Sequence, residues 1–298
     1  MRPAGIIPVL YAFWGPDGAL DEEAMRLQVE HCVAAGADGI CVLGLVTEVH
    51  KMDVAERLAL VEMVGALIGG RVPYLVTVAE PSIPGQVAFA RAAARAGADC
   101  VILQPPPIKG MSAADLLRFF GAVADAADVP VAVQNNPVNL DVSLSPDALV
   151  ELNRAHPNVA ILKGEGWSVD IARVIEGSDG AFAVLGGHGG IELPALLRSG
   201  GAGLIPAPDF LAAHVALWRA WRAGERERVE AIHRAILPAI VFMSRSVPGM
   251  LCYGKRLMAE RLGLREPPGR APALAPTPFG LSELRRHMAE IDAAPEAR

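Results

Sequence analysis

Apolar residues along this chain gather in short continuous runs, separated by longer stretches with helical periodicity. Continuous apolar runs are typical of strands buried on both faces, and an apolar stripe every three to four residues is typical of a surface helix. The strand-like runs lie at 5–12, 39–44, 73–78, 100–104, 130–134, 159–163, 181–186 and 203–206. The amphipathic stretches lie at 21–35, 53–68, 84–96, 112–126, 145–155, 168–176 and 190–199.

The junctions between these stretches repeat. The phrase Ala-Gly-Ala-Asp occurs at 35–38 and again at 96–99, each time before a strand-like run. Glycine at such a position provides the left-handed residue that ends a helix. Pro73 and Pro130 each open another run, where a proline removes no ladder hydrogen bond. The repeats indicate a regular series of helix-to-strand units.

Eight strands alternating with helices predict a (β/α)₈ barrel, an α/β fold of the TIM-barrel class. An open doubly wound sheet is the alternative, but no G-x-G-x-x-G motif follows the first run. Residues 209–223 and 225–245 read as helices, and the proline-rich stretch 267–278 precedes a last helix. We therefore expect a barrel core at 1–208, and at 209–298 the last barrel helix plus a C-terminal helical extension.

Composition narrows the choice of partners. The net charge of −6 provides no basic surface for nucleic acid. No apolar stretch approaches the roughly 18 residues that a membrane-spanning helix needs, so we expect no membrane partner. The four cysteines show no C-x-x-C pairing and resemble reduced core thiols. These features favour a cytoplasmic protein.

Lys163 is the most informative residue in the sequence. It directly follows the apolar run 159–162, and it is one of only four lysines in the chain. An amine at that position loses water, and burial favours its neutral form, which can attack a ketone to give a Schiff base. Such chemistry requires no metal or cofactor, and no group of potential ligands has the spacing of a metal site. The alternative is a strand that merely ends at the surface.

Other polar side chains also follow predicted strands, at the end where barrel enzymes carry their active sites. These are Thr47, Glu48, Gln134, Asn135, Glu165 and His188.

At these positions the chain resembles the dihydrodipicolinate synthase / N-acetylneuraminate lyase superfamily of Schiff-base lyases. The family's G-T-T-G-E corresponds to residues 44–48, and its Y-N-x-P to residues 134–137. Its imine lysine corresponds to Lys163, and its glycine after strand seven to Gly187. The resemblance implies an imine between Lys163 and the keto carbon of a pyruvate-like 2-keto acid, and a homo-oligomer, either a dimer or a tetramer.

The departures from the family pattern concern its proton relay. Its threonine pair is Leu45-Val46 here, its strand-five tyrosine is Gln134, and its loop tyrosines are Pro106 and Pro107. The arginine that synthases use for a second carboxylate falls at Asn139. These differences argue against condensation of pyruvate with aspartate semialdehyde.

A subgroup, the 2-keto-3-deoxy-arabonate dehydratases, is more similar. It shares Thr47-Glu48, Val133-Gln134 and the K-x-E pattern of Lys163 and Glu165. We therefore expect a lyase acting on a 2-keto-3-deoxy sugar acid, with dehydration favoured. A pyruvate-releasing class I aldolase is the alternative. A non-catalytic sugar-acid-binding barrel that has lost the relay is a third hypothesis, from another class.

Each candidate residue has an expected role. Glu165 is either the acid–base group at C3 and at the leaving oxygen or a solvated loop carboxylate, and His188 is either a proton carrier or an exposed loop histidine. Thr47 is expected to hold the substrate carboxylate, Glu48 to support its loop, and Gln134 to hydrogen-bond a substrate hydroxyl. Three further residues are expected to line the substrate site, namely Asn135, Gly187 and Ile205.

Overall fold

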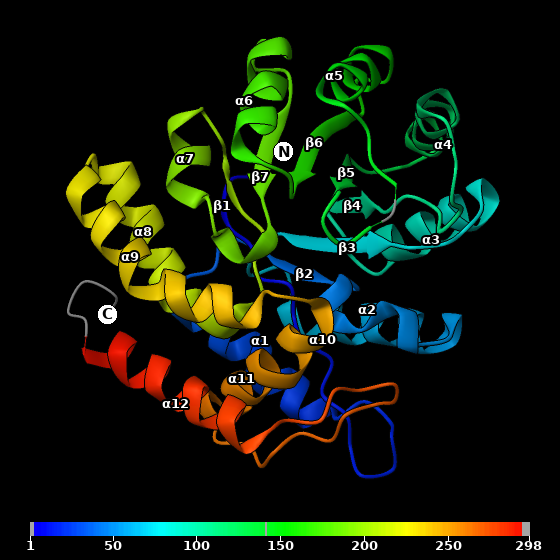
Figure 1. Cartoon of the computed structure of the whole chain (residues 1–298). Coiled ribbons are helices and arrows are strands. Elements are labelled where there is room, and N and C mark those ends of the chain that lie inside the picture. Colours follow the sequence, from blue (N-terminus) through cyan, green and yellow to red (C-terminus); the bar gives the residue numbers. More distant parts are fainter. Residues whose placement is uncertain (1–2, 141, 294–298) are drawn as a thin grey trace.

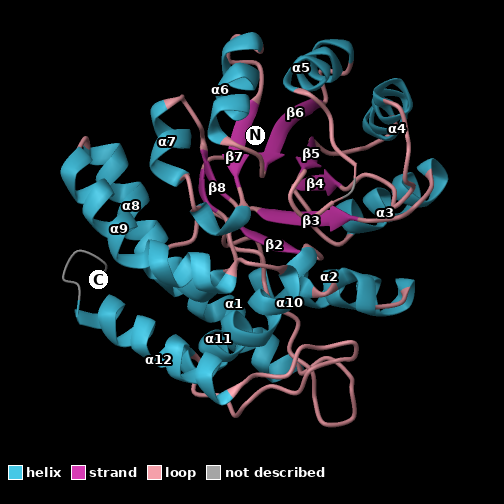
Figure 2. Cartoon of the chain, viewed as in Figure 1, coloured by secondary structure: helices cyan, strands magenta, loops and turns pink. Residues whose placement is uncertain are grey.

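The computed structural model describes residues 3–140 and 142–293, which form a barrel of parallel strands inside a ring of helices (Figures 1 and 2). The strand order in the sheet is β1-β8-β7-β6-β5-β4-β3-β2. The strands are β1 (Gly5–Ile6), β2 (Ile40–Val42), β3 (Tyr74–Val78), β4 (Cys100–Leu103), β5 (Val131–Asn135), β6 (Val159–Gly164), β7 (Ala183–Gly186) and β8 (Gly203–Leu204). The predicted (β/α)₈ class is confirmed.

The segment after β1 joins the two ends of the sheet. On one side Val9 N–H donates to Pro206 O at 2.7 Å, and on the other Leu10 N–H donates to Cys41 O at 2.9 Å. The predicted strand 5–12 is thus present as the two-residue β1 and an irregular continuation. Pro8 has no N–H to donate, which interrupts the ladder there.

The helices around the barrel fall where the apolar periodicity predicts them. They are α1 (Glu22–Ala35), α2 (Val54–Ile68), α3 (Ile83–Arg95), α4 (Ala113–Asp125), α5 (Pro146–Ala155), α6 (Ser168–Gly177), α7 (Leu193–Arg198) and α8 (Leu211–Ala223). Local sequence explains several of their starts: Asp53 with Glu56 and Ser112 with Asp115 form capping boxes. The helix predicted at 190–199 begins only at Leu193. Gly189 and Gly190 before it have positive φ and form a separate turn.

Beyond the barrel, the chain folds into a helical layer beside α8. It comprises α9 (Arg226–Met243), the short α10 (Val247–Gly249), a π-helical turn at Met250–Gly254, α11 (Lys255–Arg261) and α12 (Pro278–Ala293). α12, at the lower left of Figure 1, packs against α9. The domain boundary at residue 208 stays a prediction.

The proline-rich segment between α11 and α12 returns to the barrel. Arg270 in this segment donates to both carboxylate oxygens of Glu56 and to the carbonyl oxygens of Lys51 and Gly18. Its guanidinium also lies 4.1 Å from the ring centre of Trp14. One side chain thus fastens this segment across the loop that follows β2.

Two features of the chain bear on membrane and metal binding. In residues 3–140 and 142–293 no single helix is long and apolar enough to cross a membrane. One pair of helical stretches, Arg226–Met243 with Val247–Arg261, has the length and composition of a membrane span but is bent by 106°. Within the same residues no group of three or more His, Cys, Asp or Glu side chains is arranged to hold a metal ion.

Candidate active site

Lys163 lies near the carboxyl end of β6, where its side chain faces the mouth of the barrel. Its neighbours in register are Gln134 on β5 and Leu185 on β7. The residue is 4% exposed. Its side chain lines a cavity of about 40 Å³ together with Glu165, His188 and Ile205. The lysine is therefore a buried amine beside an internal space, as its place after the apolar run predicted.

Glu165, two residues later, is held on both carboxylate oxygens. Oε1 lies 3.8 Å from Lys163 Nζ and accepts the backbone N–H of His188 at 3.3 Å. Oε2 accepts the side-chain amide of Gln134. The residue is 7% exposed, so it is not a solvated loop carboxylate. It is placed to accept or donate a proton close to the amine.

A row of glutamines, which the sequence did not reveal as a unit, supports this carboxylate. Gln104 Nε2, just beyond β4, donates to Gln134 Oε1 at 2.9 Å. Gln86 Nε2, on α3, donates in turn to the carbonyl oxygen of Gln104 at 2.9 Å. Because Gln104 occupies the oxygen of the Gln134 amide, the NH₂ group must face Glu165. Gln134 therefore orients Glu165 directly.

The loop after β7 brings its backbone against the same carboxylate. A Cβ on Gly187 would lie 2.3 Å from Glu165 Cγ, so only glycine leaves room for this side chain. His188 has φ of 51°, a left-handed conformation that costs energy in a non-glycine residue. His233 on α9 fixes the far side of the loop, with Nε2 3.0 Å from Ile191 O. His188 is thereby placed in the wall of the cavity.

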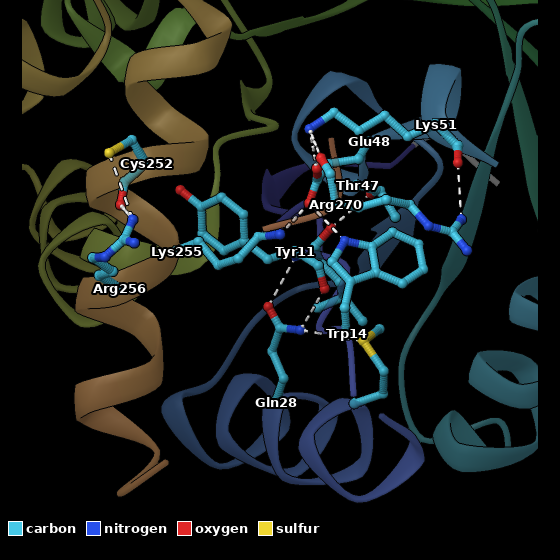
Figure 3. Close-up of polar contacts among 12 residues, drawn as sticks. Tyr11, Trp14, Gln28, Thr47, Glu48, Lys51, Cys252, Lys255, Arg256 and Arg270 are labelled. Carbon is cyan, nitrogen blue, oxygen red and sulfur yellow. Dashed lines mark hydrogen bonds and ion pairs between the residues drawn. The ribbon is translucent and has the colours of Figure 1, made fainter. Parts of the chain in front are cut away.

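Thr47 and Glu48, after β2, belong to a neighbouring structural network. Thr47 is buried, and its hydroxyl donates to Leu10 O at 2.6 Å. Glu48 pairs with the ammonium groups of Lys51 and Lys255 (Figure 3). It also accepts Trp14 Nε1–H at 3.1 Å. Neither residue lines the cavity at Lys163; that cavity is instead lined by Leu45 and Val46 from the same turn.

The remaining predicted residues have different positions. Asn135 uses its amide to hold the following loop, through two hydrogen bonds to the backbone of Leu144. Ile205 is an apolar wall of the cavity. Sequence reasoning missed several wall residues, among them Val9, Pro206, Ala207 and, from the π-helical turn, Met250. No local pattern marks a residue that approaches the site from 87 positions beyond the lysine.

A larger cavity adjoins the first. It measures about 300 Å³ and lies between the loops after β6 and β7 and helix α7. Glu165 and His188 line both cavities, while Gly187, Ser168 and Glu192 line the larger one. A cavity of about 40 Å³ accommodates a few water molecules. A longer ligand on Lys163 that entered the larger cavity would pass Glu165 and His188.

Comparison with known proteins shows the same architecture. The profile of the Dihydrodipicolinate synthetase family matches residues 2–287. The crystal structure of YagE, a prophage protein from Escherichia coli K12 in complex with pyruvate, matches with a TM-score of 0.89 at 25% identity, over 96% of this chain and 98% of that chain. A dihydrodipicolinate synthase from Rhodopseudomonas palustris matches with a TM-score of 0.90 at 23% identity, over 97% and 99%.

Two curated relatives carry different names. A 4-hydroxy-tetrahydrodipicolinate synthase from Methanospirillum hungatei is 31% identical, over 85% of this chain and 86% of the relative. The Escherichia coli K12 protein named "Probable 2-dehydro-3-deoxy-D-pentonate aldolase YjhH" is 27% identical, over 84% and 85%. The chain therefore belongs to the dihydrodipicolinate synthetase family, whose members are lyases that condense or cleave pyruvate-linked substrates.

Proposed function

We propose that this protein is a Schiff-base lyase of 2-keto-3-deoxy sugar acids and that it favours dehydration, the cleavage of a C–O bond. One observation carries the proposal: the buried amine of Lys163 shares its cavity with a single carboxylate, Glu165, among the described residues that line it. Imine chemistry at C3 and C4 requires an amine and one nearby group that exchanges protons.

The reaction would begin when Lys163 Nζ attacks C2 of the substrate and the former keto oxygen leaves as water. The protonated imine draws electrons from C3. Glu165 removes a C3 proton, and the resulting enamine expels the C4 hydroxyl, which takes up a proton from Glu165 or His188 and leaves as a second water. Hydrolysis of the imine then releases the unsaturated 2-keto acid and restores the lysine.

The residues around the imine site support Glu165 as the proton carrier. No tyrosine is among the described residues that line the cavity, so a phenol relay is absent from its wall. Leu45 and Val46 offer no hydroxyl either. Among the described residues that line the cavity, the carboxylate is the only acid–base group besides Lys163 and His188. Its two oxygens are positioned by Gln134 and by the His188 backbone.

The substrate chain would extend through the larger cavity. Carbons C1 to C3 would occupy the small space at Lys163, and the hydroxylated end would pass between Glu165 and His188. Ser168 and Glu192 in the larger cavity provide polar groups, and Ser168 N–H donates to Glu192 Oε2 at 2.9 Å. In this orientation C4 would lie beside Glu165, the carboxylate proposed to exchange protons with the leaving hydroxyl.

Aldol cleavage is the second candidate, because YjhH is named as an aldolase and is 27% identical to this chain. Cleavage needs a base that removes the proton of the C4 hydroxyl rather than a C3 proton, and Glu165 would be that base. The imine is common to both reactions. The two candidates differ in the bond that breaks: the C4–O bond of the enamine in dehydration, and the C3–C4 bond of the imine in aldol cleavage.

Product analysis separates the two reactions. Five- and six-carbon 2-keto-3-deoxy acids would be incubated with wild-type protein and with Lys163→Ala, and the products followed by NMR. Dehydration leaves the carbon chain whole, whereas aldol cleavage releases pyruvate and an aldehyde. We expect an intact chain with the wild type and no turnover with Lys163→Ala. Pyruvate as the main product would overturn the preference for dehydration.

We further propose that the enzyme works as a homo-oligomer, a dimer or tetramer, in the cytoplasm. Exposed apolar side chains follow three neighbouring strands, among them Ile108, Val138 and Trp167, and Trp167 is 63% exposed. Such residues favour contact with another protein surface. Light scattering of wild type and Trp167→Glu tests the assembly: a monomeric wild type would contradict it.

The proposed cytoplasmic location rests on the cysteines: all four are buried and free, which suits a reducing compartment.

A further inference from the structure

A second cavity lies on the other side of the turn that follows β2. It measures about 220 Å³ and is separate from both spaces at Lys163. Its walls come from the turn after β2, from the helical stretch 247–256, and from the proline-rich segment 267–274. Figure 3 shows the charged groups of this region, with Glu48 between Lys51 and Lys255. The mechanism proposed above uses none of these charged groups.

Positive charge exceeds negative charge in its walls. The charged lining residues are Lys51, Lys255, Arg256 and Glu48. Arg256 is neutralised from outside the cavity by Glu266, at 2.8 Å. The other two cations share a single carboxylate, that of Glu48. One positive charge is therefore left without a counter-ion in the wall. His50, which also lines the cavity, adds no negative charge.

Lys255 is the group that most needs a further partner. It is 3% exposed, and among the described residues Glu48 is its only hydrogen-bond acceptor. An ammonium has three N–H donors, so two of them remain for a ligand. Lys51, in contrast, also donates to Arg270 O at 2.8 Å. A buried cation with unused donors is costly unless an anion completes it.

The rest of the lining defines what kind of anion fits. Prolines and aliphatic side chains form most of the wall, including Pro248, Leu251, Pro267, Pro272 and Leu274. These groups offer nothing to the hydroxyls of a sugar acid, but they suit a ring or a short aliphatic chain. From the cationic pole and the apolar wall together, we propose that this cavity binds a small monocarboxylate with an apolar body, its carboxylate on Lys255.

The site is connected to the catalytic cavity through shared structure. Leu45 lines both cavities. Met250 lines the catalytic one, and its neighbour Leu251 lines the second. A ligand that fixes the turn after β2 and the π-helical turn would therefore alter the shape of the space beside Lys163. Occupancy is expected to change KM for the keto-acid substrate without any contact to the imine.

Calorimetric titration with benzoate tests the proposal, and benzamide is the matched neutral probe. Benzoate has no ketone, so it cannot form an imine with Lys163, and the result is independent of the proposed reaction. We expect saturable binding of one benzoate per chain, at least tenfold weaker binding of benzamide, and at least tenfold weaker binding of benzoate to Lys255→Met. Lys163→Ala is expected to bind benzoate as the wild type does.

A second variant leaves the ion pairs in place. Ala273→Phe puts a ring into the cavity from the proline-rich segment and should abolish benzoate binding while Lys255 still pairs with Glu48. It remains informative if Lys255→Met does not fold. No saturable binding of benzoate, equal binding of benzamide, full binding by Ala273→Phe, or loss of binding in Lys163→Ala would each overturn the proposal. If inorganic phosphate bound as tightly as benzoate, the claim that the ligand has an apolar body would be wrong.

Discussion

The carboxylate oxygen Oε1 of Glu165 lies 3.8 Å from the amine nitrogen of Lys163. Lys163 lies near the end of β6 and Glu165 directly follows that strand. The Glu165 N–H still donates to Asn135 O on β5, so the extended backbone continues and both side chains turn toward the barrel mouth. The Gln134 amide and the His188 backbone N–H fix the carboxylate in this position. An imine formed on Lys163 would thus have its proton carrier already in place.

Glu165→Gln should separate imine formation from proton transfer. The amide keeps the shape of the side chain but cannot exchange protons at neutral pH, so we expect kcat to fall about 10²- to 10⁴-fold. Trapping of a 2-keto acid on Lys163 by borohydride should persist. The control is Glu176→Gln, which removes an exposed carboxylate of α6 that lines neither cavity. Similar kcat losses in both variants would remove Glu165 from the reaction.

Gly187→Ala should displace the Glu165 side chain while leaving the residue itself a glutamate. The new Cβ would lie 2.3 Å from Glu165 Cγ, so the carboxylate has to move away from Lys163. We expect kcat to fall at least tenfold, because misplaced catalytic groups lose much of their effect. Gly166→Ala is the matched control: its Cβ would meet Pro137 at an ordinary 3.6 Å. Steady-state kinetics of the two variants decide, and an unchanged kcat in Gly187→Ala would contradict the geometry.

Glu48→Gln should cost stability. The amide leaves the ammonium groups of Lys51 and Lys255 without a counter-charge inside the protein. Removing one partner of a buried ion pair costs about 3–5 kcal/mol, and we expect a loss of that order in the free energy of unfolding. Glu230→Gln removes an exposed pair with Arg198 and should cost about 1 kcal/mol or less. Denaturant titrations of both variants provide the comparison; equal losses would contradict this role for Glu48.

Asp209→Asn should change how stability depends on pH. Burial raises the pKa of Asp209 from 3.8 to about 6. Between those values only the folded state binds the proton, so the favourable contribution of this group is present at low pH and lost as the pH rises through 6. Asparagine stays neutral. The difference in unfolding free energy between the variant and the wild type should therefore shift in favour of the variant by on the order of 2 kcal/mol from pH 4 to pH 7.5.

The matched control for this change is Asp147→Asn, because the Asp147 side chain is 90% exposed. Comparing the two variants cancels the contribution of other titrating groups, among them the buried His214. Denaturant unfolding at a series of pH values provides the measurement. Parallel stability profiles for wild type and Asp209→Asn would show that this carboxyl does not titrate with folding.

The fold and the buried position of Lys163 could be predicted because their signals are local. Glycine-ended helices and continuous apolar runs repeat along the chain, and Lys163 interrupts the apolar pattern at the end of one run. The eight-strand order and the family match confirm the fold. Glu165 is a candidate from the sequence because it lies two residues past Lys163, just beyond the end of the same strand.

The environment of the lysine could not be predicted, because it depends on contacts between distant residues. Glu48 meets Lys255 across 207 positions, and Gln104 meets Gln134 across 30. Nothing near Met250 marks it as part of the cavity wall. Thr47 shows the converse: its position in the motif suggested a substrate contact, whereas its hydroxyl donates to Leu10 O.

Borohydride trapping with pyruvate, read by peptide mass spectrometry, tests the central claim most directly. The wild type should gain the mass of one reduced pyruvate adduct on the peptide that contains Lys163, and Lys163→Ala should gain none. The adduct requires both a ketone and borohydride, so lactate in place of pyruvate is the control. An unmodified Lys163 peptide, or an adduct on Lys51 or Lys255 instead, would contradict the account.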